Sequence, residues 1–137
     1  MLTYQKFCKE TFDENGTLTN LEIECEDTFN FAYDVVDRIA QETPDRTALV
    51  WCDKHREERI FTFRDMSLLS NQAANVFRKH GIGRGDKVML ILKRHYQYWY
   101  ALLGLHKLGA VAIPSTHMLT ERDIAYRVEN AQIKVII

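Results

Sequence analysis

Three short apolar runs near the C-terminal end constrain the fold of this chain most strongly. They are KVMLIL at residues 87–92, AVAIP at 110–114 and KVII at 134–137. None of them shows the polar alternation of a strand with one solvated face, which indicates strands buried on both faces. Sequences with helical apolar spacing separate the runs. This order predicts a βαβαβ unit with a parallel sheet, right-handed connections and helices on both faces.

The helices of this unit carry clear boundary signals. Two of them begin with a threonine followed three positions later by an aspartate, the spacing of a capping box: Thr62 with Asp65 and Thr120 with Asp123. The first of these helices should end at Gly81, because glycine readily takes the left-handed conformation that closes a helix. Residues 96–108 form a helix that is apolar nearly all round, so we expect it to pack between the sheet and further protein.

The N-terminal part of the sequence is organised differently. From Phe29 onward the sequence carries the apolar stripe of an amphipathic helix, which Pro44 ends. Residues 47–52 and 59–63 are short β-rich runs that predict a hairpin with a charged, solvated loop. Residues 1–28 are polar and acidic, and we interpret them as a surface-wrapping arm with a short helix near residues 3–12. The predicted class is therefore α/β, a three-layer parallel-sheet half-domain preceded by a short β-hairpin and N-terminal helices.

The stretch GIGRGDKVMLIL, residues 81–92, places three glycines at alternate positions before an apolar run. A dinucleotide-binding loop needs its glycines after a strand and at the start of a helix, where amide groups and the helix dipole hold a pyrophosphate. Here the glycines precede the strand. We therefore interpret Gly81, Gly83 and Gly85 as a helix end and a turn, in which the Asp86 carboxylate accepts amide hydrogen bonds. The sequence contains no G-x-x-x-x-G-K-[ST] phosphate loop.

Two polar triplets follow the first two apolar strands at their carboxyl ends: Lys93, Arg94 and His95, and Ser115, Thr116 and His117. The carboxyl ends of neighbouring parallel strands meet at one edge of a sheet, where ligands bind in open α/β folds. Positive charge and hydrogen-bond donors at that edge suit an anionic ligand. These six rim residues are our candidates for substrate contact, and the alternative is that they are ordinary solvated loop residues.

The composition narrows the class of protein. With 137 residues, of which 46% are hydrophobic and 27% charged, the chain has the size and balance of one globular domain. A formal net charge of -1 argues against sequence-independent nucleic-acid binding, which needs a basic surface. No apolar run reaches the length of about 18 residues that a membrane span requires. The polar N-terminal residues lack the apolar region of a signal peptide, so a cytoplasmic location is expected.

Chemically reactive side chains do not form a recognisable active site. Cys8, Cys25 and Cys52 are widely spaced and odd in number, which suits a reducing compartment better than a disulfide framework or a zinc site. The histidines show no i, i+4 or HxH pairing typical of metal ligands. No serine or cysteine lies in the G-x-S-x-G pattern of a nucleophile elbow. We therefore assign no catalytic, cofactor-binding or metal-ligating residue.

Several motifs occur together in an order that resembles a known family. The segments FTFRDM, NQAANVFRKHGIGRGDKVMLIL and LHKLGAVAIPSTHMLTERDIAYRVENAQIKVII are similar to the N-terminal part of adenylate-forming acyl-CoA synthetases. The matching positions are Thr62-Phe63, Gly81, Gly85-Asp86, Gly109-Ala110, Pro114, Leu119 and Ile124. The resemblance covers residues 29–137, which would be the first part of the AMP-binding domain. Details such as FNFAYDVVDRIA look most like the medium-chain branch, next to the acetyl-CoA synthetases.

The resemblance implies a ligase that uses ATP, Mg and CoA. In such enzymes a carboxylate attacks the α-phosphate of ATP to form an acyl-adenylate, and the thiol of coenzyme A then displaces AMP. The family's phosphate loop and catalytic lysine lie further along a longer chain, so no catalytic residue is carried over to this sequence. The matched glycines, Pro114 and Asp86 are carried over as scaffold only. The chain alone is expected to be inactive, with a short- to medium-chain carboxylate, ATP and CoA as the partners of the longer protein.

A second reading of the sequence remains open. The chain would then be a small α/β binding or regulatory module without catalysis that shares the βαβ plan. The run IKVII at residues 133–137 is typical of an interior strand, which favours an N-terminal fragment over a complete module. A sheet with an uncovered apolar edge is also expected to allow pairing with a second copy of the chain.

Overall fold

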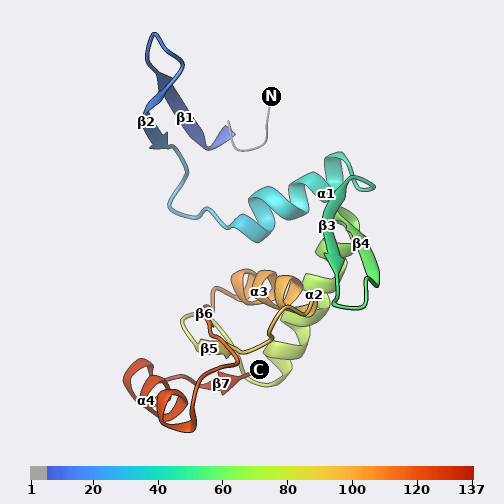
Figure 1. Cartoon of the computed structure of the whole chain (residues 1–137), viewed down its shortest axis with the longest axis vertical. Helices are drawn as coiled ribbons and strands as arrows, with labels where there is room; N and C mark the ends of the chain where they lie inside the picture. The colour runs from blue at the N-terminus through green and yellow to red at the C-terminus, as the bar shows by residue number, and fades with distance from the viewer. Residues whose placement is uncertain (1–5) are drawn as a thin grey trace.

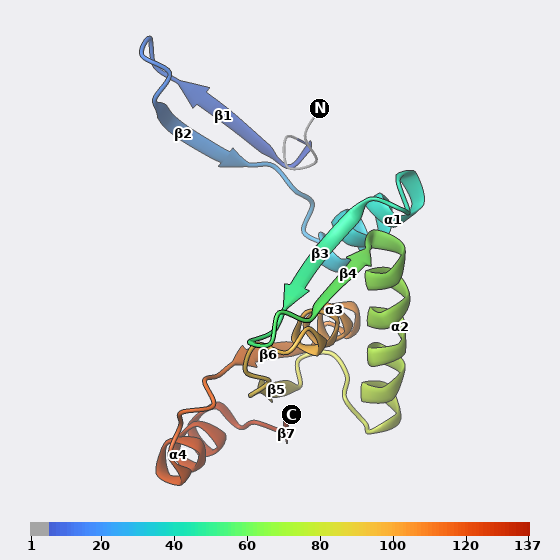
Figure 2. The ribbon, with the colours of Figure 1, turned by 45° about the vertical axis from the view of Figure 1, so that its right-hand side comes forward.

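A computed structural model of the chain describes residues 6–137, and Figure 1 shows its elements in order. Strands β5 (Lys87–Leu90), β6 (Val111–Pro114) and β7 (Val135–Ile136) form a parallel sheet in the order β6-β5-β7. Helices α3 (Gln97–Leu108) and α4 (Glu121–Ala131) connect them and lie on opposite sides of the sheet (Figures 1 and 2). The predicted α/β class and the βαβαβ order are confirmed.

Burial of the three strands is unequal. Val88, Met89 and Leu90 in the central strand β5 are fully buried, as predicted. The same prediction is wrong for β6 and β7, because Val111 is 44% exposed and Ile136 is 45% exposed. Both strands lie at the edges of the sheet, and every side chain of α4 is at least partly exposed. Apolar runs identify strands, whereas burial depends on what covers each strand.

Helix α2 (Phe63–Lys79) begins and ends as its sequence predicts. Asp65 N–H donates to Thr62 Oγ1 over 3.2 Å, and the Asp65 carboxylate accepts the Thr62 N–H over 2.9 Å. The same reciprocal bonds join Thr120 and Asp123 at the start of α4. At the C-terminal end, Gly81 has a φ of 77° and Ile82 N–H donates to the carbonyl of Phe77 over 3.0 Å. This pattern is a Schellman motif, and it confirms Gly81 as the end of the helix.

Replacing Gly81 with valine should lower the free energy of unfolding by about 1 kcal/mol or more. The added Cβ would meet nothing within 4 Å, so the cost arises from the positive φ and not from a clash. Gly81→Asn is the matched control, since asparagine tolerates the left-handed region better than a β-branched residue. Urea unfolding of the two variants measures the difference. Equal stability of the wild type and the valine variant would contradict the assignment.

Helix α3 is packed between the sheet and other helices, as predicted. Leu105 contacts Val88 and Leu90 of β5 in one apolar cluster, whereas Leu103 joins Val36 and Met66 in a second cluster on the other side. Gly104 allows α3 to approach α2 closely: a Cβ there would lie 2.9 Å from the Cβ of Ala73. The helix is therefore covered on both sides, which explains its lack of a polar face.

The helix predicted from Phe29 to the region before Pro44 is present but is not uniformly α-helical. It starts with a π-helical segment η2 (Phe31–Asp37) and continues as α1 (Arg38–Glu42). Its apolar stripe, Ala32, Val36 and Ile39, is buried as predicted. The spacing of this stripe, four and then three residues, is that of an α-helix, so the sequence pattern gives no indication of the wider π-helical turn.

Polar side chains bind this helix to the end of α3. Asn30 Nδ2 donates to the carbonyl oxygen of His106 over 2.7 Å. Lys107, whose side chain is 1% exposed, donates from Nζ to Asp37 Oδ1 and to Asn71 Oδ1, both over 2.8 Å. Its ammonium group also lies 5.5 Å from the ring centroid of Tyr33. One buried cation thus joins η2, α2 and α3.

Two antiparallel hairpins precede the parallel sheet. Strands β3 (Thr47–Cys52) and β4 (Glu58–Thr62) form the hairpin that the sequence predicts. The helix predicted near residues 3–12 is wrong for residues 8–12, which form β1 (Cys8–Phe12) and pair with β2 (Leu18–Ile23); residues 3–5 lie outside the described part. The Asp13 carboxylate accepts the amides of Asn15 and Thr17 in the turn, which favours a hairpin over a helix.

The β1–β2 hairpin projects away from the rest of the chain and does not wrap over its surface (Figures 1 and 2). Its base is held by Phe7, whose ring centroid lies 5.0 Å from that of Phe29, and by an ion pair between Lys6 and Glu42 of 3.6 Å. Its large apolar side chains remain exposed: Phe12, Leu18, Leu21 and Ile23.

Candidate functional site

The carboxyl edge of the parallel sheet holds both polar triplets. Leu90 of β5 lies directly opposite Pro114 of β6, so the two strands end at the same level. Ser115 N–H extends the ladder by donating to the carbonyl oxygen of Leu90 over 2.9 Å. The segments that carry the rim residues therefore leave the sheet side by side. This juxtaposition follows from the parallel register, as the sequence implied.

The first triplet borders a small hollow. A cavity of about 240 Å³ is lined by Lys93, Arg94 and His95 together with Tyr98 and Trp99 from the first turn of α3. The Lys93, Arg94 and His95 side chains are exposed to solvent. Two aromatic rings beside two cationic side chains form a surface that can accept an organic anion.

The second triplet lies at the same edge but outside the set that lines this hollow. Ser115 is half-buried, whereas Thr116 and His117 are exposed. Thr116 Oγ1 accepts the N–H of Met118 over 3.2 Å, which shapes the turn before α4. The structure thus brings Lys93, Arg94 and His95 into one concave surface and leaves Ser115, Thr116 and His117 beside it.

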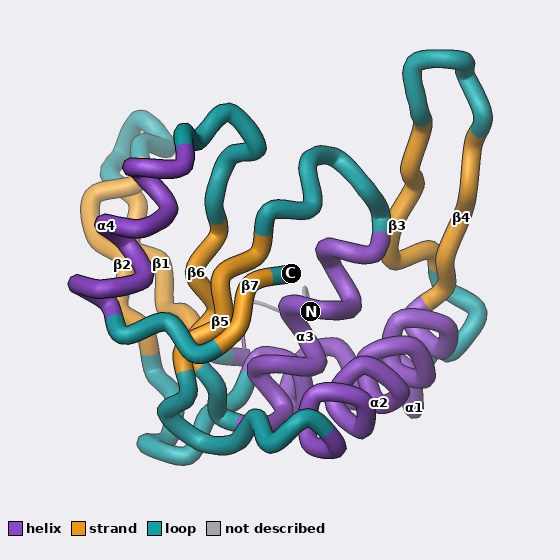
Figure 3. The backbone as a smooth tube through the Cα atoms, turned by 90° about the horizontal axis from the view of Figure 1, so that it is seen from below, coloured by secondary structure: helices purple, strands orange, loops and turns teal. Residues whose placement is uncertain are grey.

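Sequence reasoning missed one contact at this edge. Trp51 Nε1 of β3 donates a hydrogen bond of 2.6 Å to the carbonyl oxygen of Arg94. Figure 3 shows the loop between β5 and α3 running beside the β3–β4 hairpin. No local pattern predicts this bond, because it joins residues 43 positions apart in the sequence.

The glycine-rich turn lies at the opposite edge of the sheet, before β5. Its hydrogen-bonding groups are used within the chain: Gly83 N–H donates to Asp86 Oδ2 over 2.8 Å, and Gly85 N–H donates to the carbonyl oxygen of Gly109 over 2.9 Å. Lys134, the residue before β7, donates to Asp86 Oδ2 over 2.8 Å. This arrangement confirms the interpretation of Asp86 as a turn residue and adds Lys134 as its partner.

Acid should remove part of the stability that this turn supplies. Hydrogen bonds from Lys134 and then from the Gly83 amide hold the pKa of Asp86 below its usual value. A carboxylate with a lowered folded-state pKa stabilises the fold above its unfolded-state pKa of about 4, and the effect is lost as pH falls through the folded-state pKa. Asp86→Asn should therefore lower the melting temperature at neutral pH, with a difference that shrinks below about pH 4.

Thermal unfolding between pH 7 and 3 tests this prediction. Asp45→Asn is the control, because the Asp45 carboxylate is exposed and lies 3.5 Å from Arg64. A destabilisation by Asp86→Asn that stays constant over this pH range would show that the ionised carboxylate is not responsible.

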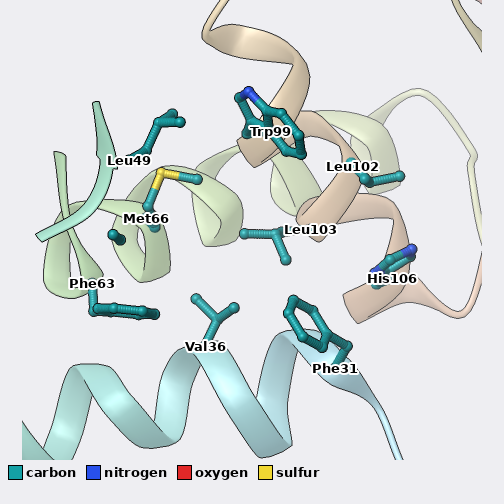
Figure 4. Close-up of a pocket in the computed structure, with 10 residues that line it drawn as sticks. Phe31, Val36, Leu49, Phe63, Met66, Trp99, Leu102, Leu103 and His106 are labelled. Carbon is teal, nitrogen blue, oxygen red and sulfur yellow. The ribbon is translucent and has the colours of Figure 1, made fainter. Parts of the chain in front are cut away.

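A larger apolar pocket shares Trp99 with the rim hollow (Figure 4). Its volume is about 380 Å³, and its walls come from η2, β3, α2 and α3. Trp99 and Phe31 are each about half exposed, and His106 is the one ionisable side chain among the lining residues. Burial lowers the pKa of His106, so this imidazole is held in its neutral form at physiological pH. The pocket therefore offers apolar contact without a charged group.

Within residues 6–137, no three His, Cys, Asp or Glu side chains come together as metal ligands. None of the described helices combines the length and hydropathy that a membrane crossing requires.

Comparison with solved structures places the fold among N-terminal domains of adenylate-forming enzymes. The N-terminal subdomain of Klebsiella oxytoca NpsA is 29% identical in sequence, with a TM-score of 0.67 over 76% of this chain and 26% of that one. The N-terminal domain of FACL13 from Mycobacterium tuberculosis is 26% identical, with a TM-score of 0.70 over 78% of this chain and 26% of that one. The fold is thus that of the N-terminal domain of an adenylate-forming enzyme.

Sequence comparison identifies the family. The profile of the AMP-binding enzyme family matches residues 36–137. Mouse (Mus musculus) mitochondrial acyl-coenzyme A synthetase ACSM3 is 36% identical over 86% of this chain and 21% of its own length. Acetyl-coenzyme A synthetase of Bacillus subtilis is 34% identical over 79% of this chain and 19% of its own length. The chain belongs to the AMP-binding enzyme family, and it spans about a fifth of the length of these relatives.

Proposed function

We propose that this chain is the first part of an ATP-dependent ligase that joins a short- to medium-chain carboxylate to coenzyme A. The observation that carries the proposal is the family match over residues 36–137, together with relatives that are named as acyl-CoA synthetases. A further relative, 36% identical over 80% of this chain and 20% of its own length, is 4-hydroxybutyrate--CoA ligase 1 of Metallosphaera sedula. We divide the chain into an N-terminal arm, residues 1–28, and the first part of the AMP-binding domain, residues 29–137.

The proposed reaction has two balanced steps. A carboxylate oxygen attacks the α-phosphorus of ATP, and pyrophosphate leaves as an acyl-adenylate forms. The sulfur of coenzyme A then attacks the acyl carbon, its proton goes to solvent or a base, and AMP leaves as the thioester forms. Both steps develop negative charge on phosphate oxygens, so catalysis depends on positive charge and hydrogen-bond donors placed around them.

In this proposal, the described residues form part of the scaffold of the active site, and the carboxyl edge of the parallel sheet forms one of its borders. Lys93 and Arg94 supply positive charge at the carboxyl edge of the sheet, where a phosphate or carboxylate group would meet them. The same part of the chain does not fit a magnesium site, since residues 6–137 bring together no cluster of carboxylate ligands. The two proposed steps therefore involve no metal ion held by these residues.

Carboxylate-dependent exchange of labelled pyrophosphate into ATP tests the proposal. A protein of the relatives' length that carries this chain should catalyse exchange with at least one linear acid of about two to twelve carbons. The chain of 137 residues alone should not, because the phosphate loop of the family lies outside it. Reactions without acid and without protein are the controls. Absence of exchange by the long protein with every acid in this range would overturn the proposal.

The rim residues can be tested in the same assay. Replacing Arg94 with alanine in the long protein should raise the KM for ATP, acid or coenzyme A several-fold, with a smaller change in kcat. Lys79→Ala is the control, because Lys79 is an exposed cation at the far end of α2. If both variants keep the wild-type KM for all three substrates, the rim residues are solvated loop residues.

A further inference from the structure

One rung of the β3–β4 hairpin contacts the loop that carries Lys93, Arg94 and His95. Trp51 and Arg59 lie opposite each other on the two strands. Trp51 Nε1 donates to the carbonyl oxygen of Arg94 over 2.6 Å, and Arg59 Nη1 donates to the hydroxyl of Tyr96 over 3.0 Å. The hairpin thus holds the loop both within the triplet and immediately after it.

Tyr96 connects the hairpin to the start of α3. Its ring centroid lies 5.3 Å from that of Trp51 in an edge-on arrangement and 5.1 Å from that of Phe61. The guanidinium carbon of Arg59 lies 5.0 Å from the same centroid, within the range of a cation–π interaction. Because Tyr96 directly precedes α3, these contacts position the first turn of the helix, which carries Tyr98 and Trp99.

The loop itself contains a strained residue. Lys93 has a φ of 42°, in the left-handed region that residues with a Cβ occupy reluctantly. Such a conformation persists where neighbouring contacts hold it in place. His95 N–H donates to the carbonyl oxygen of Leu92 over 3.0 Å, and the Trp51 bond holds Arg94 between them. The hydrogen bond from the Trp51 indole reaches the loop from β3, at the residue after Lys93.

We propose that Trp51 and Arg59 are positioning residues, which hold the loop so that Lys93, Arg94 and His95 border the hollow together with Tyr98 and Trp99. The relevance of this arrangement to an anionic ligand rests on the proposed function of the edge. The positioning itself is a property of the 137-residue chain and can be measured there without activity.

Trp51→Phe is the first test, because phenylalanine keeps an aromatic ring and removes the indole donor. Amide hydrogen exchange at Arg94, His95 and Tyr96 should become about 3- to 10-fold faster, the change expected for loss of one hydrogen bond. Exchange in α2 and β5 should stay the same. Val50→Ala is the matched control, since Val50 is the exposed neighbour of Trp51 on β3. Arg59→Met is a second variant that removes the bond to Tyr96 and keeps an aliphatic stem.

A second measurement separates this inference from the proposed function. Inorganic pyrophosphate is titrated against the wild-type chain and Trp51→Phe while the imidazole resonances of His95 are followed by NMR. Several-fold weaker binding of pyrophosphate to the variant, with an unchanged melting temperature, supports both the positioning role of Trp51 and the anion-binding role of the edge. Faster loop exchange without pyrophosphate binding to either protein supports positioning and contradicts the anion-binding role of the edge. Unchanged exchange at Arg94–Tyr96 in both Trp51→Phe and Arg59→Met overturns the positioning proposal.

Discussion

Replacing Asp37 with alanine is expected to lower the free energy of unfolding by about 3–5 kcal/mol. The Lys107 ammonium group is buried, and Asp37 supplies the one carboxylate among its hydrogen-bond partners, at 2.8 Å. Without that carboxylate, a buried cation would keep the Asn71 amide and the Tyr33 ring beside it but no negative charge among these neighbours. Urea unfolding followed by circular dichroism measures the loss.

Two comparisons show whether the loss of stability in Asp37→Ala arises from the buried charge of Lys107. Arg38→Ala disrupts an exposed ion pair with Glu42, 3.0 Å long, and should cost no more than about 1 kcal/mol. Asp37→Leu combined with Lys107→Met removes both charges and should regain most of the stability, because a buried pair is often replaceable by apolar groups. If Asp37→Ala cost no more than Arg38→Ala, the buried cation would not need its carboxylate.

Gly104→Ala should lower the free energy of unfolding by about 1–3 kcal/mol, although alanine is the better helix former. The new Cβ would lie 2.9 Å from Ala73 Cβ, 2.9 Å from Ala74 N and 3.1 Å from the Ser70 carbonyl oxygen. Two of these atoms are backbone atoms of α2, so relief requires the two helices to move apart. Thermal unfolding, with a crystal structure of the variant, measures both the cost and the displacement.

Gly83→Ala is the matched control for Gly104→Ala. Gly83 has no positive φ, and an added Cβ would approach only Asp86 Oδ2, at 3.9 Å. Its effect should stay within about 0.5 kcal/mol, as for other substitutions that meet open space. Combining Gly104→Ala with Ala73→Gly should restore only part of the stability, because the contact with Ala74 N remains. A Gly104→Ala variant as stable as wild type would show that the α2–α3 contact is looser than its geometry implies.

Local signals were sufficient for most element boundaries. Thr62 with Asp65 and Thr120 with Asp123 act over one helical turn, and Gly81 acts through its own φ, so their neighbours in sequence decide the outcome. The β1–β2 hairpin was missed although Asn15-Gly16 is a known turn signal. Its strands carry charged residues among few apolar ones, and alternation in such segments is weak.

The sequence predicts which segments meet at the candidate site, but it does not predict the side-chain contacts that hold them there. Parallel register alone brings the segments that begin near Lys93 and Ser115 to one edge, and that register follows from the order of strands and helices. The Trp51 bond to Arg94 and the approach of Lys134 to Asp86 join residues more than 40 positions apart. Such pairs carry no periodic pattern, so a single sequence does not reveal them.

The sequence by itself determined the α/β class, the strand and helix order and the role of the glycine-rich turn, because backbone geometry and apolar periodicity are properties of short segments. Only the tertiary structure decided which strands are buried, which cation lies in the interior and what holds the rim loop. Val111 and Val88 are chemically alike, yet one is exposed and the other buried, since only the central strand is covered on both sides. Burial and pairing depend on neighbours that the chain acquires by folding.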